Sequence, residues 1–299
     1  MLPAYTRPDD LSELIDILSS RPGGFVLAGG TDLMVQMRLG LRRPAIVADV
    51  SDVARMHRLE LGPHPTLGAT TTIRSLVATA DLRSRFPALA QAGALLGGRQ
   101  IQAMATIGGN ICNASPAAET ATPLLVYDAE AVIAGTTGER SLPLTDFWLG
   151  PGRTSLAPGE ILVEVHLAGE AFGSHSAYRR LELRRSVDIA IVSASAALDV
   201  QDGMIVGARV AVGAVAPTPR RVPSAEQALV GAEVTAADGR VSEALLRRIC
   251  EAAAECRGAA QPIDDVRASA RYRAAMVEVI ARRSILASLG LGEQVCGDA

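Results

Sequence analysis

The sequence predicts an α+β protein with two main domains, and the change of pattern between its halves carries this prediction. In the second half, strand-like runs come first and helical runs follow, which is typical of an antiparallel sheet with helices on one face. In the first half, short apolar runs alternate with helical patterns and glycine-rich turns. Residues 168–176 contain glycine and serine without periodicity, so we expect domains over 1–172 and 173–292 and a tail over 293–299.

The first half is expected to begin with a short helix. Leu11, Leu14 and Leu18 recur at helical spacing, and Asp10 before them is a good N-cap residue. The apolar run 25–27 predicts a short buried strand. The other expected strands are 45–50, 66–69, 131–134 and 161–165, and the expected helices are 72–80 and 87–98.

The second half is expected to hold strands followed by helices. Gln201, Asp202 and Gly203 are typical of a hairpin turn, and they separate the last two strand-like runs. The expected strands are 176–183, 189–200 and 205–215, and the expected helices are 224–230, 241–255 and 270–289.

Composition excludes several classes of protein. All 29 basic residues of the 299 are arginine. Without lysine, the chain can build neither a P-loop NTPase site nor a pyridoxal Schiff base. A net charge of −3 argues against a nucleic-acid partner. No apolar run is long enough to cross a bilayer and no secretory signal is visible, so we expect a cytoplasmic protein without a transmembrane segment.

The histidines and cysteines do not predict a metal site. The histidines are dispersed, and the cysteine spacings match no zinc or iron–sulfur motif. We therefore expect no bound metal, and we expect any redox or group-transfer chemistry to use an organic cofactor.

Two glycine-rich motifs are the most informative features of the chain. Residues 28–33 are AGGTDL and follow a predicted strand, and residues 106–110 are TIGGN. Paired glycines let the backbone approach a ligand closely, and successive N–H groups in such a turn can surround an anion. A helix beginning at Thr31 would add its positive end. Together the motifs predict a divided cradle for a diphosphate, and neither has the G-x-G-x-x-G pattern of a Rossmann nicotinamide site.

Several segments in order resemble the FAD-binding medium subunit of the molybdenum hydroxylases, the family of xanthine and carbon monoxide dehydrogenases. They are AGGTDL, RQIQAMATIGGNICNASPAAE, LRRSVDIAIVSA and VGAVAPTPRR, and the resemblance covers nearly the whole chain. It implies a vanillyl-alcohol-oxidase-type FAD-binding domain, in two subdomains divided near residue 55, followed by a C-terminal α+β domain. It also implies FAD as the cofactor, with contacts from Leu27, Ala28, Gly29, Gly30, Thr31, Asp32, Leu33, Leu96, Thr106, Ile107, Gly108, Gly109, Asn110, Cys112, Asn113, Glu119, Ile161, Leu162 and Arg180.

Some of these implied contacts also have a plainer interpretation. Cys112 stands where the family has Val or Ile beside the flavin ring, and the alternative is an inert buried thiol. Asn113 can donate and accept hydrogen bonds at the flavin. Glu119 replaces a family Asp near the ribityl hydroxyls, and the alternative is a surface carboxylate. Leu162 packs either on the flavin or in an ordinary core, and Arg180 keeps the charge but not the shape of a family Lys.

The resemblance implies an electron-transfer subunit of a heterotrimeric enzyme rather than the site of substrate hydroxylation. A large molybdopterin-binding subunit would hold the substrate, and a small subunit would hold 2Fe–2S clusters. FAD in this chain would pass electrons to a quinone, NAD or oxygen. No acid–base constellation is visible, so we expect no catalytic side chain. Two alternatives stay open: a self-contained FAD-dependent oxidoreductase of the same superfamily, and a scaffold that has lost FAD.

Overall fold

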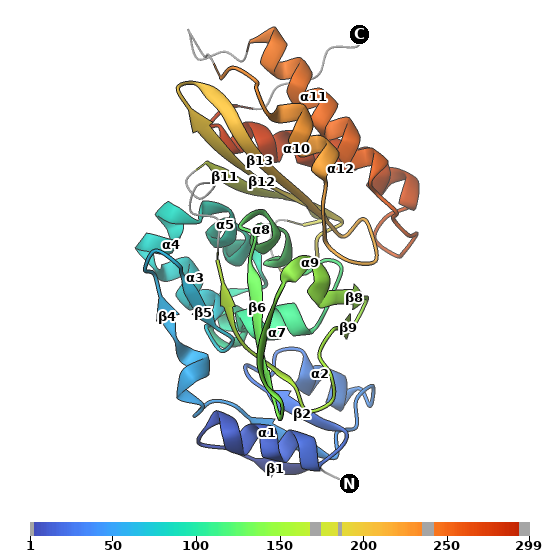
Figure 1. The fold of residues 1–299 in the computed structure, drawn as a ribbon. Coiled ribbons are helices and arrows are strands. Elements are labelled where there is room, and N and C mark those ends of the chain that lie inside the picture. The colour runs from blue at the N-terminus through green and yellow to red at the C-terminus, as the bar shows by residue number, and fades with distance from the viewer. Residues whose placement is uncertain (1–2, 168–174, 185–186, 235–241, 293–299) are drawn as a thin grey trace.

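The computed structural model describes residues 3–167, 175–184, 187–234 and 242–292. An N-terminal subdomain lies at one end, a second subdomain lies in the middle and a C-terminal domain lies at the other end (Figure 1). The expected domain boundary at residue 172 and the tail over 293–299 fall outside the described residues.

The N-terminal subdomain is a small parallel sheet with crossover helices. Its strands lie in the order β1-β3-β2, and β3 pairs in parallel with both neighbours. The first helix begins as predicted, because the Asp10 carboxylate accepts a hydrogen bond of 2.9 Å from the N–H of Glu13. The elements are β1 (Ala4–Thr6), α1 (Leu11–Ser20), β2 (Gly24–Leu27), α2 (Leu33–Arg38) and β3 (Ile46–Asp49).

The second subdomain is built on an antiparallel sheet in the order β4-β5-β10-β6-β7, with short helices around it. The sheet strands are β4 (Leu59–Glu60), β5 (Thr66–Gly68), β6 (Glu130–Gly135), β7 (Gly138–Pro143) and β10 (Ile161–His166). Between β5 and β6 the chain forms α3 (Ile73–Ala78), α4 (Ala80–Arg85), α5 (Pro87–Leu95), α6 (Arg99–Met104), α7 (Ile107–Cys112) and α8 (Ala121–Val126). The remaining short elements are η1 (Ala54–His57), α9 (Leu144–Phe147), β8 (Trp148–Gly150) and β9 (Arg153–Thr154).

The C-terminal domain has the predicted order of strands followed by helices. Its antiparallel sheet runs β11-β12-β13-β14, and the predicted hairpin turn joins β12 to β13. The two-residue strand β14 carries no periodicity of its own and was not predicted. The elements are β11 (Ser176–Leu181), β12 (Val192–Gln201), β13 (Met204–Gly213), β14 (Arg220–Arg221), α10 (Pro223–Leu229), α11 (Glu243–Gly258) and α12 (Ala270–Ser288).

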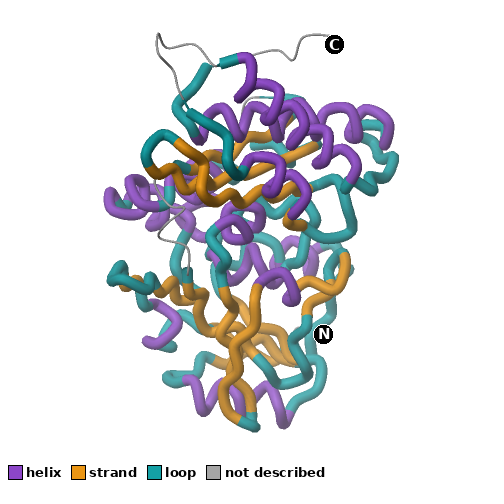
Figure 2. Tube along the Cα trace, turned by 45° about the horizontal axis from the view of Figure 1, so that its top comes forward, coloured by secondary structure: helices purple, strands orange, loops and turns teal. Residues whose placement is uncertain are grey.

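Helices cover both faces of the C-terminal sheet. Helices α10 and α12 contact one face, and α5 and α8 of the second subdomain contact the other (Figure 1). Figure 2 shows helices on both sides of this sheet. Along β12, Ala194 and Ala196 join the core under the C-terminal helices, whereas Ala197 joins the core of the first domain. Ser195 Oγ donates a 3.0 Å hydrogen bond to Thr122 Oγ1 on that second face. This double coverage explains why β12 is buried on both faces from Val192 to Leu198 and why its residues facing the first domain, such as Ser195 and Ala197, are small.

A buried hydroxyl group links the two domains. Tyr127 Oη shares a 2.6 Å hydrogen bond with Ser176 Oγ of β11, and the N–H of Ala88 donates to Tyr127 Oη at 3.1 Å. The Tyr127 ring meets Phe86 edge-on, with centroids 5.0 Å apart. Burial raises the pKa of Tyr127, so the hydroxyl keeps its proton and its hydrogen bonds across the ordinary pH range.

We expect Tyr127→Phe to lower the free energy of unfolding of the full chain by about 1–2 kcal/mol. The variant keeps the ring contact with Phe86 but removes the hydroxyl group that Ala88 and Ser176 use. Urea unfolding followed by circular dichroism measures the change. Tyr272→Phe is the matched control, because Tyr272 is 46% exposed. Equal losses in the two variants would contradict the link.

Candidate functional site

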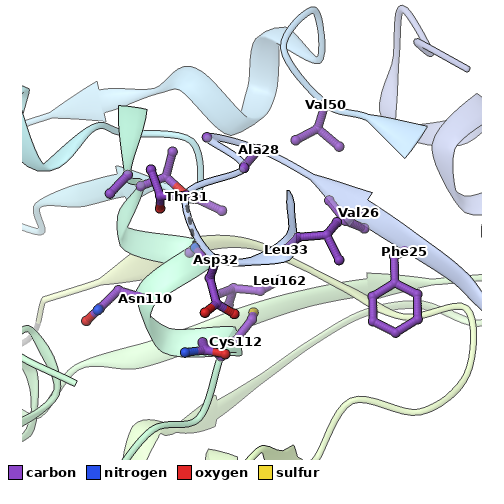
Figure 3. A pocket seen from close by; sticks show the side chains of 18 of the residues that line it. Phe25, Val26, Ala28, Thr31, Asp32, Leu33, Val50, Asn110, Cys112 and Leu162 are labelled. Carbon is purple, nitrogen blue, oxygen red and sulfur yellow. Dashed lines mark hydrogen bonds between the residues drawn. The ribbon is translucent and has the colours of Figure 1, made fainter. Parts of the chain in front are cut away.

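A pocket of about 400 Å³ lies between the N-terminal subdomain and the second subdomain (Figure 3). Strand β2 and the turn after it form one wall, and α7 with the start of β10 forms another. Phe25 and Val26 line the pocket from β2 (Figure 3). The strand predicted over 25–27 is present as β2, but its residues are half-buried rather than buried because the strand lines the pocket.

The first glycine motif is an open turn with free backbone donors. Gly30 has a φ of +67°, the left-handed conformation that favours glycine. In the described part of the chain, no hydrogen bond uses the N–H groups of Gly29, Gly30, Thr31 or Asp32. Helix α2 begins at Leu33 rather than at the expected Thr31. Four successive free donors in the wall of a pocket can surround an anion.

The second glycine motif is the first turn of helix α7 rather than a loop. The hydroxyl of the N-cap residue Thr106 accepts a 3.0 Å hydrogen bond from the N–H of Gly109. The N–H groups of Ile107, Gly108 and Asn110 donate to backbone carbonyls at 2.9, 2.8 and 3.0 Å. The prediction of a second cluster of free donors was therefore wrong, because these donors already have protein partners.

The two motifs lie against each other because Gly29 has no side chain. A Cβ on Gly29 would lie 1.6 Å from the carbonyl oxygen of Met104, just before Thr106. Gly108 makes a similar approach on its other side, where a Cβ would lie 2.6 Å from the carbonyl oxygen of Ala69. Gly29 thus allows the two walls of the pocket to approach each other, and Gly108 allows α7 to pack beside β5.

Most of the predicted contact residues line this pocket. They are Ala28, Gly29, Gly30, Thr31, Asp32, Leu33, Leu96, Thr106, Gly108, Gly109, Asn110, Cys112, Asn113, Ile161 and Leu162. Leu27, Ile107, Glu119 and Arg180 do not line it. Ile107 is fully buried in the core of the first domain, on which α7 packs.

Cys112 and Leu162 both line the pocket (Figure 3). Burial raises the pKa of the Cys112 thiol to about 12. The thiol is therefore protonated at neutral pH and inert as a nucleophile. Leu162 is compatible with both of its interpretations. It is a core residue of β10 that is only 2% exposed, and it also lines the pocket.

Glu119 and Arg180 contact each other outside the pocket lining. Arg180 Nη1 donates to Glu119 Oε1 at 2.8 Å, and Arg180 Nε donates to Glu182 Oε2 at 2.7 Å. The interpretation of Glu119 as a surface carboxylate was wrong, because its side chain is 11% exposed and that of Arg180 is 2% exposed. Burial raises the pKa of Glu119 to about 7, against the opposing effect of the Arg180 cation.

The sequence analysis missed a polar and aromatic group on the pocket wall. Phe25, Gln36 and Arg42 all line the pocket. The guanidinium carbon of Arg42 lies 5.5 Å from the centroid of the Phe25 ring. These residues flank the first motif and α2 without a motif of their own. The only feature of the sequence that could have indicated this group was Phe25, an aromatic residue shortly before the glycine turn.

Two further observations concern the described residues as a whole. Among them, no helix is both long enough and apolar enough to cross a membrane. The same residues contain no group of three or more His, Cys, Asp or Glu side chains that could hold a metal ion.

Comparison with known proteins identifies the family. Residues 2–167 match the FAD binding domain in molybdopterin dehydrogenase, and residues 176–288 match the CO dehydrogenase flavoprotein C-terminal domain. The chain belongs to the FAD-binding subunits of the molybdenum hydroxylases. As a member of this family, the protein carries FAD as its cofactor.

Individual relatives of this FAD-binding subunit match over nearly their full length. The xanthine dehydrogenase FAD-binding subunit of Escherichia coli O157:H7 is 32% identical over 94% of both chains. The nicotine 6-hydroxylase medium subunit of Paenarthrobacter nicotinovorans is 29% identical over 95% of this chain and 97% of its own. A carbon monoxide dehydrogenase structure from Hydrogenophaga pseudoflava matches with a TM-score of 0.88 and 26% identity, over 97% of this chain and 98% of the matched chain.

The site of this FAD-binding subunit fits its cofactor. A diphosphate needs closely spaced donors, and the turn at Gly29 to Asp32 offers four free N–H groups on the pocket wall. An apolar ring needs an apolar wall, and Leu96, Ile161 and Leu162 provide one.

We expect Gly29→Ala to lower FAD affinity by about tenfold or more, because the added Cβ must displace the Met104 peptide and separate the pocket walls. Flavin absorbance per chain and titration of the apoprotein with FAD measure the loss. Gly62→Ala is the matched control, since a Cβ there meets nothing within 4 Å. Full FAD affinity in Gly29→Ala would show that the close approach is not needed.

We expect Glu119 to make stability depend on pH. Its pKa of about 7 lies above the ordinary value of 4.5, so the folded chain holds a proton that the unfolded chain has lost. The neutral Glu119 carboxyl group stabilises the folded chain fully at pH values below the pKa that Glu119 has in the unfolded chain. This stabilisation is lost as the pH rises through about 7.

Glu119→Gln removes this titration and retains a hydrogen-bond acceptor for Arg180. The melting temperature of the variant minus that of the wild type should therefore rise between about pH 5 and about pH 8. The same comparison with Glu130→Gln, at an exposed position, should stay flat. A difference for Glu119→Gln that does not change with pH would rule out the titration.

Proposed function

We propose that this chain is the FAD-carrying electron-transfer subunit of a molybdopterin and iron–sulfur hydroxylase. It would pass electrons from the 2Fe–2S clusters of a partner subunit, through FAD, to an external acceptor. The observation that carries the proposal is the pocket itself, in which free backbone donors adjoin a buried apolar wall. Its described lining residues include no histidine, and its thiol is protonated. Such a pocket supports a role in binding and orienting the cofactor that transfers the electrons.

We assign separate parts of the cofactor to separate parts of the pocket. The N–H groups of Gly29 to Asp32 bind the diphosphate, and Leu96, Cys112 and Leu162 contact the ring system. When bound, FAD supplies the redox chemistry, and the protein supplies binding and orientation.

Hydrogen bonds from Thr120 fix the orientation of the Asn110 side-chain amide. Its Oδ1 atom accepts hydrogen bonds of 3.2 Å and 2.6 Å from the N–H and the hydroxyl of Thr120. The amide NH₂ group is therefore the part of Asn110 left to donate in the pocket. Asn113, one helical turn later, lines the same wall and can donate or accept.

The partners we propose are a large molybdopterin-binding subunit and a small 2Fe–2S subunit, which together with this chain form a heterotrimer. Several relatives are named as medium chains or medium subunits. Exposed apolar side chains on and near α2 and α6 support a subunit interface, namely Val35 (53% exposed), Leu39 (67%), Leu41 (70%) and Met104 (56%). The proposed acceptor is a quinone, NAD or oxygen, and a cytoplasmic location stays a prediction from the sequence.

Purification of the tagged chain from its native host tests this function. We expect a molybdopterin-containing chain and a 2Fe–2S chain to co-purify, detected by mass spectrometry, molybdenum analysis and electron paramagnetic resonance. A chain that purifies alone and oxidises a substrate unaided would favour a self-contained oxidoreductase. A colourless chain that cannot be reloaded with FAD would favour a scaffold.

A further inference from the structure

We propose that Arg42, stacked on Phe25, binds the adenylate half of FAD and makes the site selective for FAD over FMN. Both side chains line the pocket, and the guanidinium carbon lies 5.5 Å from the ring centroid. A planar cation above an aromatic ring presents a flat face to a base and N–H donors to a phosphate oxygen. An adenylate group carries both of these features.

A short chain of hydrogen bonds orients the Arg42 side chain. Arg42 Nε donates to Gln36 Oε1 at 3.0 Å, and Gln36 Nε2 donates to Asp32 Oδ2. In the described part of the chain, no hydrogen bond or ion pair uses Nη1 or Nη2 of Arg42. The side chain is thus held through one nitrogen while its other two nitrogens remain available to a ligand.

A diphosphate is negatively charged and the pocket already contains carboxylates, so binding a diphosphate there requires a nearby cation. Arg42 is the one cation among the described lining residues, and Asp32 and Glu160 are the carboxylates. Glu160 is paired with Arg140, whose Nη2 lies 2.7 Å from Glu160 Oε2. Among the described residues, the Asp32 carboxylate accepts a side-chain hydrogen bond only from the amide of Gln36, so an anion beside it needs a positive charge nearby. Arg42 supplies that charge on the side of the pocket formed by β2.

The apolar and polar ends of the pocket indicate which half of FAD each receives. Leu96 and Leu162 are buried and apolar, which suits the larger isoalloxazine ring. Arg42 is exposed and is bonded to Gln36, which suits a nucleotide that carries hydroxyl groups and phosphate. Figure 3 shows Phe25 and Asn110 at opposite sides of the pocket, with Leu162 between them.

Titration of the full-length apoprotein with FAD and with FMN tests this inference. We expect Arg42→Ala to weaken FAD binding by about tenfold or more and to leave FMN binding within about twofold of wild type. Arg43→Ala, which removes the neighbouring exposed charge outside the pocket lining, should change neither. Arg42→Lys should recover only part of the FAD affinity, because lysine keeps the charge but loses the planar stack. Circular dichroism melts check that each variant is folded.

Two results would overturn the inference. One is unchanged FAD affinity in Arg42→Ala. The other is an equal loss of FAD and FMN, which would place Arg42 at the flavin half or make its role structural. If Arg42→Ala does not fold, Arg42→Gln provides the same comparison. The inference rests on FAD binding alone, so it can fail while the electron-transfer role stands, and the co-purification experiment tests that role separately.

Discussion

The pocket depends on how closely two backbone segments approach each other at Gly29. The carbonyl oxygen of Met104 lies 1.6 Å from the place where any other residue would put its Cβ. This contact joins a turn of the N-terminal subdomain to the link before α7, and so it sets the spacing of the pocket walls. Leu14 and Val50 of the same subdomain belong to one continuous core with the second subdomain. The pocket therefore lies between two parts that share a core.

The two glycine motifs contribute to the site in different ways. The turn after β2 lies beyond the end of its sheet. In the part of the chain that the structure describes, no neighbouring strand offers carbonyls there, so the N–H groups of the turn remain free for a ligand. The first turn of α7 docks against the end of β5, and carbonyls there accept its N–H groups. Gly108 and Gly109 line the pocket as small residues that leave space. The first motif supplies free N–H donors, and the second leaves space for a ligand.

Part of the C-terminal sheet belongs to the hydrophobic core of the first domain. Tyr178, Ala197 and Ala211 of this sheet belong to the core of the first domain and would be exposed if the two domains separated. The Glu119–Arg180 pair lies at this junction. Burying such a pair costs desolvation free energy, and Arg180 offsets part of that cost by contacting two carboxylates. The hydrogen bond from Arg180 to Glu119 joins the two domains at this junction.

The sequence by itself determined the fold class, the order of elements in the C-terminal domain and the position of the first glycine turn. These features are local, because helical spacing, the hairpin turn at Gln201 to Gly203 and paired glycines act over a few neighbouring residues. Tertiary structure decided which N–H groups stay free, since a donor is free only if no distant carbonyl reaches it. It also decided that Glu119 is buried against Arg180 and that Arg42 lies over Phe25. Those contacts join residues that are far apart in the chain or that flank a helix, and no sequence period records them.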